Sequence, residues 1–164
     1  MIERSALRSI GRVRVNHALE HACITILSGR VNNVVLRGRS NRHGFYVWGD
    51  VPTEAVESAA AEALQRLSNG EAELAIHPFC GTNLAVSGLL AGTASAIALK
   101  SARKGEGLPA SILAALLALL AAQPIGFWTQ RTLTTSSRVG HARIVSVKRK
   151  RLLGQTLHFV STSQ

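Results

Sequence analysis

Several features that define common protein classes are scarce in this sequence. Its only cysteines, Cys23 and Cys80, are too few for a disulfide framework. Nine acidic residues face nineteen basic ones, which gives a formal net charge of +10. Aromatic residues make up 4% of the chain, too few to favour a surface that stacks nucleic-acid bases. We therefore expect the positive charge to attract anionic lipid headgroups, and we expect no nucleic-acid partner.

Charged residues are missing from two long segments. Residues 74–99 and 108–130 contain no Asp, Glu, Lys or Arg, and a short charged loop at 100–107 separates them. A bilayer core requires about 20 apolar residues in a helix. We predict a transmembrane helical hairpin with helices at about 80–99 and 108–130. The alternative is a helical hairpin buried in a soluble core.

The predicted hairpin carries signals for packing and orientation. Gly88 and Gly92 form a G-x-x-x-G motif, which suits close approach of the second helix or of a second copy of the chain. No apolar signal-peptide core is visible in the first sixteen residues. Because about 75 residues precede the first helix without such a signal, we expect both polar flanks to be cytoplasmic.

The polar flanks predict one α+β domain that the membrane hairpin interrupts. The expected division is an N-terminal α+β part at 1–79, the hairpin at 80–131 and a β-hairpin at 132–164 that completes the sheet. We interpret the basic run at 148–151 as a solvated turn or strand edge, with a binding patch as the alternative. The predicted helices are 5–28 and a second that begins near 50–53 and ends at 69–70; the predicted strands are 31–36, 44–48, 71–76, 141–147 and 156–162.

The segment His17-Ala-Leu-Glu-His21 carries the strongest chemical signal. Its H-x-x-E-H spacing places two imidazoles on one face of a helix, with Glu20 beside them. This face is also an apolar stripe, so the three polar groups require buried partners. A zinc ion held by His17 and His21, with Glu20 as general base, meets that need. A hydrogen-bond network with Asn16, Arg14 or a strand residue is the alternative.

A catalytic zinc ion usually has three protein ligands and one water. The segment 77–83 is the best source of the third ligand, because His77 and Cys80 stand just before the first predicted membrane helix. Either residue can instead be part of a simple connector between a strand and that helix. His43, in a predicted turn, is a weaker candidate. Glu54 and Glu57 are expected mainly to interact with the dipole of the second helix.

Four stretches together resemble a family of uncharacterised bacterial membrane proteins found in photosynthetic bacteria. They are Asn16–Ala22 (NHALEHA), Gly38–Phe45 (GRSNRHGF), Gly49–Ala55 (GDVPTEA) and His77–Asn83 (HPFCGTN). The resemblance covers roughly residues 12–130 and implies a small two-helix protein of the bacterial inner membrane, with no established activity. A separate similarity to inverzincin metalloproteases covers only the five residues of H-x-x-E-H. Insulysin-type inverzincins use a downstream glutamate as third ligand, whereas residues 74–105 here contain no acidic residue.

Three functions remain open from the sequence. The first is a membrane-anchored zinc hydrolase or peptidase that uses His17, His21 and Glu20. The second is a non-enzymatic assembly or cofactor-handling protein that binds a metal or a tetrapyrrole. The third is a structural membrane adaptor whose histidines are hydrogen-bonded core groups. No serine-nucleophile elbow, P-loop or dinucleotide-binding motif occurs to support another chemistry.

Overall fold

The computed structural model describes residues 2–103, 105–152 and 154–164, with the backbone alone described for residues 2–6. The fold is α+β, as the sequence predicts. The chain divides into two compact units. Residues 1–77 and 133–164 form the first, which we call the sheet unit, and residues 78–132 form the second, the hairpin unit.

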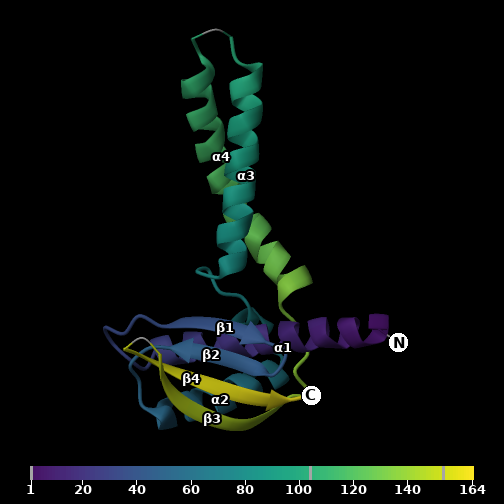
Figure 1. Cartoon of the computed structure of the whole chain (residues 1–164), viewed down its shortest axis with the longest axis vertical. Helices are drawn as coiled ribbons and strands as arrows, with labels where there is room; N and C mark the ends of the chain where they lie inside the picture. Colours follow the sequence, from purple (N-terminus) through teal and green to yellow (C-terminus); the bar gives the residue numbers. More distant parts are fainter. Residues whose placement is uncertain (1, 104, 153) are drawn as a thin grey trace. The chain divides into compact units, whose positions relative to one another are not determined.

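The sheet unit contains a four-stranded antiparallel sheet (Figure 1). Its strand order is β1-β2-β4-β3. The outer strands β1 and β3 each pair with the inner strand that follows them in the sequence, which makes two β-hairpins. The central pair β2–β4 joins the two flanks of the chain, with Phe45 opposite Val160 and Val47 opposite His158. The prediction that both flanks complete one sheet is therefore confirmed. The strands are β1 Arg37–Asn41, β2 Gly44–Trp48, β3 Arg143–Leu152 and β4 Gln155–Ser163.

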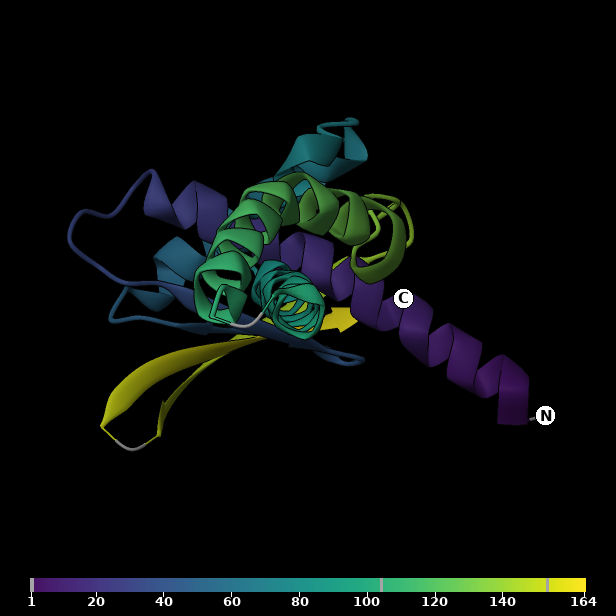
Figure 2. The same cartoon turned by 90° about the horizontal axis from the view of Figure 1, so that it is seen from above.

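Two helices, α1 (Ile2–Ser28) and α2 (Thr53–Ser68), pack on one face of this sheet (Figures 1 and 2). α1 lies mainly over β1 and β2, and α2 over β3 and β4. The buried face of α2 is rich in alanine, which lets it approach its neighbours closely. The core between helices and sheet contains Ala18, Leu19, Ala22, Cys23, Leu27, Phe45, Val47, Val56, Ala59, Ala60, Ala63 and Val160.

Two predicted strands are wrong. Residues 31–36 form an irregular connection with Asn33 at a φ of 59°, and the strand begins only at Arg37. The short turn between Asn41 and Gly44 fixes the register of the β-hairpin. The polar segment Arg37–Asn41 therefore pairs with β2, and the more apolar segment 31–36 does not. Residues 71–76 form a 3₁₀ helix, η1 (Ala72–Ala75), instead of a strand. Its Glu, Ala and Leu residues favour helical backbone.

The basic run at 148–151 lies inside strand β3, at an edge of the sheet, and not in a turn. β3 is longer than the predicted 141–147 strand because it stays paired with β4 as far as Leu152 opposite Gln155. An irregularity in the register between Ile144 and Ser146 leaves Val145 exposed. Charged residues on an edge strand discourage pairing with another sheet.

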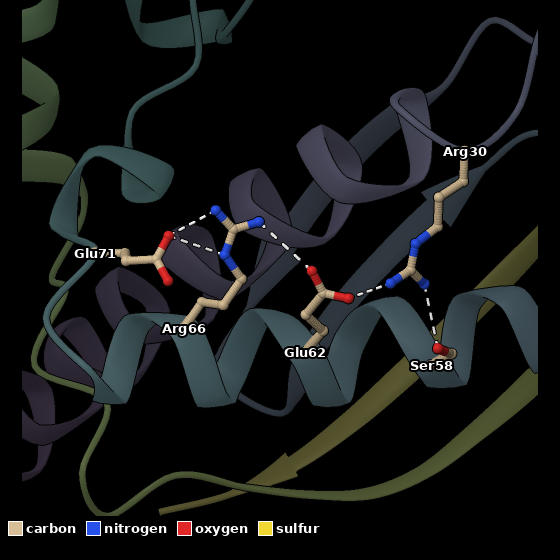
Figure 3. Close-up of polar contacts among 5 residues, drawn as sticks. All are labelled: Arg30, Ser58, Glu62, Arg66 and Glu71. Atoms are coloured by element: carbon tan, nitrogen blue, oxygen red, sulfur yellow. Dashed lines mark hydrogen bonds and ion pairs between the residues drawn. The ribbon is translucent and has the colours of Figure 1, made fainter.

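A surface network of charged side chains joins α1, α2 and η1 (Figure 3). Arg30, just after α1, donates to Ser58 Oγ at 3.1 Å and pairs with Glu62 of α2. Arg66 bridges Glu62 and Glu71, with its shortest contact to Glu71 at 2.6 Å. The hydrogen bond from Arg66 lowers the pKa of Glu71. The network ties the C-terminal ends of both helices to the loop that follows α2.

The hairpin unit contains α3 (Gly81–Ser101) and α4 (Gly107–Thr129). After α4 the chain continues as a short π-helix, η2 (Gln130–Thr134), whose last two residues belong to the sheet unit. Both helices are long and apolar enough to cross a membrane. Near one end, the side chain of Asn83 donates to the carbonyl of Pro78 at 2.8 Å and accepts from Gln130 at 2.7 Å. Gly126 of α4 leaves room for Asn83, because a Cβ there would lie 2.3 Å from Asn83 Oδ1.

Candidate metal centre

The predicted pair His17 and His21 lies side by side on α1. Their ring centres are 4.3 Å apart in an edge-on arrangement. One ring nitrogen of each lies within 4.8 Å of one ring nitrogen of the other. Two nitrogens bound to one zinc ion lie roughly 3–3.5 Å apart, so a small side-chain adjustment is enough for chelation. The helical spacing of the motif thus produces the juxtaposition that the sequence predicts.

Main-chain carbonyls fix the orientation of both rings. His21 Nδ1 lies 2.8 Å from the carbonyl oxygen of Ala75 in η1, and His17 Nδ1 lies 3.0 Å from that of Thr134. A carbonyl oxygen can only accept, so each Nδ1 carries the proton. In the neutral form, each ring then presents the lone pair of Nε2. Metal-binding histidines in proteins are held in the same way.

His77 lies beside this pair within the sheet unit. Its ring centre is 5.7 Å from that of His21, and the side chain is half-buried. η1 anchors this part of the chain, because its last residue, Ala75, supplies the carbonyl that holds His21, and His77 follows two residues later. The imidazoles of His17, His21 and His77 therefore lie together, where α1 is next to the segment that follows η1.

Cys80 belongs to the hairpin unit, where it caps the N-terminus of α3. Its sulfur accepts a hydrogen bond from the backbone N–H of Thr82 at 3.4 Å, and the residue is 8% exposed. Only Pro78 and Phe79 separate Cys80 from His77 in the sequence. The chain therefore limits the distance between the α-carbons of His77 and Cys80 to roughly 11 Å.

Glu20 is buried between α1 and strand β1. The residue is 5% exposed, and its carboxylate lies directly against Gly38. A Cβ at Gly38 would lie 2.3 Å from Glu20 Oε1, so the glycine is what allows the carboxylate to lie there. The H-x-x-E-H and G-R-S-N-R-H-G-F stretches thus meet at this contact.

The weaker candidate ligands are all exposed. His43 lies in the turn between β1 and β2, where its Nε2 accepts from Arg42 at 2.9 Å. Glu54 and Glu57 lie on the exposed side of α2.

Asn16, which the sequence analysis named as a possible hydrogen-bond partner of the H-x-x-E-H group, bonds to the two sheet hairpins and the chain end instead. It is fully buried and donates to the carbonyl of Asn41 at 2.7 Å. Its Oδ1 accepts from Thr162 at 2.7 Å and from Gln164 at 2.9 Å. Asn16 thereby links α1 to both hairpins of the sheet, at the position directly before His17.

His158 is a second buried polar residue that the sequence analysis missed. It is fully buried in β4, and its Nε2 lies 3.3 Å from Thr53 Oγ1. Burial lowers its pKa, and Arg149 lowers it further, while Asp50 and Glu54 oppose the shift. The alternation of side chains along β4 could have predicted this burial, because His158 lies on the same face of the strand as the core residue Val160.

Comparison with known proteins identifies a family without assigning an activity. Residues 12–147 match the family described as a domain of unknown function, DUF6391. An uncharacterised protein of Picosynechococcus sp. is 39% identical over 93 aligned residues, which cover 51% of this chain and 45% of that protein. The chain thus spans less than half the length of this curated relative. No solved structure matches it. Because the family match extends over most of its length, this chain belongs to the DUF6391 family.

Proposed function

We propose that this chain is a membrane-anchored metal protein, with the hairpin unit as its anchor. The 21 residues of α3 extend over roughly 31 Å, close to the thickness of a bilayer hydrocarbon core. Leu84, Leu89 and Leu120 are each more than 70% exposed, an arrangement that suits lipid far better than water. Arg131, Arg138 and Arg143 follow the second helix and favour a cytoplasmic position for the sheet unit, on the inner face of a bacterial inner membrane. The basic residues of the loop at 100–107 oppose this orientation, because that loop would lie on the other side of the membrane.

The observation that carries the metal proposal is the matched orientation of His17 and His21. Each Nδ1–H donates to a main-chain carbonyl, and the two rings lie one helical turn apart. A hydrogen bond of this kind fixes the tautomer and raises the basicity of the other ring nitrogen. Zinc favours neutral imidazole in tetrahedral sites, and we propose it as the bound ion.

The third ligand in this proposal is Cys80 or His77. A thiolate from Cys80 would complete a His₂Cys set, and His77 a His₃ set; both occur in catalytic zinc sites. The proximity of His77 to His21 supports the His₃ set. The His₂Cys set is supported by the short segment, Pro78 and Phe79, that separates Cys80 from His77.

The reaction that we propose for this site is hydrolysis of a membrane-associated peptide, amide or ester. A bound zinc ion would polarise the substrate carbonyl. Glu20 would act as general base and move a proton from water to the leaving group. Its position one residue before His21 supports this role.

A non-enzymatic metal- or cofactor-handling protein is the second candidate. The contact between the Glu20 carboxylate and Gly38 favours it, because a side chain held against a strand has less freedom to shuttle protons. In that case the same histidines bind the metal, or a tetrapyrrole, without turnover.

Elemental analysis of the detergent-purified full chain tests metal binding. We expect about one zinc ion per chain in the wild type and in His43→Ala, whose histidine is exposed, and loss of the ion in His17→Ala/His21→Ala. Cys80→Ser and His77→Ala, measured in parallel, identify the third ligand by the larger loss of affinity. Wild-type protein that stays without metal after incubation with zinc would overturn the proposal and leave the structural adaptor.

The variant Glu20→Gln separates the two candidate functions. A hydrolase would retain zinc and lose activity towards ester or peptide substrates by roughly 100-fold or more. A binding protein would retain both its zinc and its physiological function. Circular dichroism of the variant controls for a folding defect caused by the altered contact with Gly38.

A further inference from the structure

The face of the sheet opposite α1 and α2 carries aromatic and basic side chains together. Both helices of the sheet unit pack on one face, and within the described part of that unit no helix lies on the other (Figures 1 and 2). Because side chains alternate along a strand, the residues next to the buried Phe45 and Val47 point to this outer face. Tyr46 and Trp48 are two of them, and each is half-buried.

The strand register arranges this face in two rows. In the first row, Arg39 stands opposite Tyr46, Tyr46 opposite Phe159, and Phe159 opposite Lys148. The second row repeats the pattern one pleat further along. It runs Arg37, Trp48, Leu157 and Lys150. Each row therefore has a cation on both edge strands and rings or apolar side chains on the central strands.

The aromatic side chains of the central strands form a continuous group. The ring centres of Tyr46 and Phe159 are 4.7 Å apart, and those of Tyr46 and Trp48 are 5.6 Å apart. These three residues are a large share of the seven aromatic residues in the chain, counted as four Phe, two Trp and one Tyr. The low overall aromatic content therefore hides a local concentration on one surface.

Two hollows share Trp48 and Arg151 as lining residues. The first lies on this surface, and the second lies at the end of the sheet, where β2 ends and β4 begins. The first has a volume of about 490 Å³ and is also lined by Arg39, Tyr46 and Lys150. The second has a volume of about 410 Å³ and is also lined by Arg37 and Asp50. Asp50, its acidic lining residue, is paired with Arg149 at 3.4 Å. The sheet unit thus offers two recesses that share a tryptophan, with basic side chains lining each.

We propose that this face binds single-stranded nucleic acid. The rings of Tyr46, Trp48 and Phe159 would stack on unpaired bases, and the basic side chains of β1 and β3 would contact the phosphates. The positive charge favours an anionic partner, and the half-buried rings favour one with planar apolar groups. Two recesses that share Trp48 fit successive units of a polymer. A lipid headgroup layer offers the charge without the planar groups, so the surface matches it less well.

The test uses the detergent-purified full chain and a fluorescein-labelled oligothymidylate of about ten nucleotides. Fluorescence anisotropy should show binding that Trp48→Ala weakens at least about fivefold and Trp48→Phe largely restores. Trp128→Ala removes the other tryptophan, in the hairpin unit, and should leave the affinity unchanged. In Trp128→Phe, where Trp48 is the only tryptophan left, the oligonucleotide should quench the fluorescence of Trp48.

A second pair of variants tests the phosphate contacts. Lys150→Ala should reduce the slope of log affinity against log salt by about 0.7, the value for one contact to a single strand, whereas Lys100→Ala should not change it. The proposal is overturned if the oligonucleotide does not bind, or if Trp48→Ala and Trp128→Ala bind it equally. It is also overturned if Trp48 governs binding to phosphatidylglycerol-containing vesicles but not to the oligonucleotide. These outcomes are independent of zinc content, so they do not depend on the proposed metal centre.

Discussion

At the scale of single residues, Gly38 determines where the carboxylate of Glu20 can lie. The missing side chain of Gly38 leaves the space that Glu20 occupies between α1 and β1. Gly38→Ala would force a buried side chain to move and should lower the free energy of unfolding by about 1–3 kcal/mol. Denaturant unfolding followed by circular dichroism measures the change. Gly11→Ala is the control, because nothing lies within 4 Å of that position on α1. Gly70 also has open space around it, but its φ of 95° would strain an alanine, so it is not a suitable control.

The same contact predicts an energetic coupling between two residues. If Gly38→Ala destabilises the chain by displacing the Glu20 side chain, a second change, Glu20→Ala, should remove most of that cost. A double-mutant cycle should give a coupling of about 0.5–3 kcal/mol. Strict additivity would show that the cost of Gly38→Ala does not arise from displacement of the Glu20 side chain.

His158 gives the sheet unit a pH dependence of its own. Because its pKa is lowered in the folded state, the unfolded chain binds more protons as the pH falls through the usual range near 6.5. Stability should therefore be fully present above that range and decrease as the pH falls into it. The difference in unfolding free energy between wild type and His158→Gln, measured from pH 8 to pH 5, isolates this contribution from the other histidines. A difference that does not vary with pH would contradict it.

At the scale of elements, patterns that arise within one segment predict the structure well. The apolar stripe of α1, the start of α2 at residue 53 and both long apolar helices follow from residues inside those segments. Segments 31–36 and 71–76 were predicted wrongly because strands need partners. The turn at 42–43 fixes the pairing of β1, and the helix-forming residues of 72–75 outweigh a weak apolar pattern. The His17–His21 pair was predictable from its helical spacing, whereas the carbonyls of Ala75 and Thr134 come from segments distant in sequence.

The close approach of α4 to Asn83 of α3 requires a glycine at position 126. Gly126→Ala would place a methyl group against Asn83 and disturb its hydrogen bonds with Gln130 and Pro78. We expect a lower thermal stability of the hairpin in detergent, measured by circular dichroism. Gly88→Ala and Gly92→Ala are matched controls, since nothing lies within 4 Å of either position. Loss of a dimer in these two controls would support the association that their G-x-x-x-G motif predicts.

At the scale of the whole molecule, the hairpin unit is inserted into a unit that has its own sheet, helices and core. Main-chain hydrogen bonds to His21 and His17 hold Ala75 and Thr134, which lie near the two points where the chain leaves and re-enters the sheet unit. The two rings are adjacent, so these points are close together in space. A linker of about six Gly and Ser residues, which spans up to roughly 20 Å, is therefore long enough to replace residues 78–132.

This shortened chain should fold and remain soluble without detergent, because all four strands, α1, α2 and the buried core belong to the sheet unit. Its circular dichroism should show less helix and a cooperative thermal transition. The shortened chain retains His77 and lacks Cys80, so its affinity for zinc also separates the two proposed ligand sets. Unchanged zinc affinity would assign the third ligand to His77, and a loss comparable to that of Cys80→Ser in the full chain would assign it to Cys80. A chain that aggregates would show that the insertion stabilises the sheet unit and does more than anchor it.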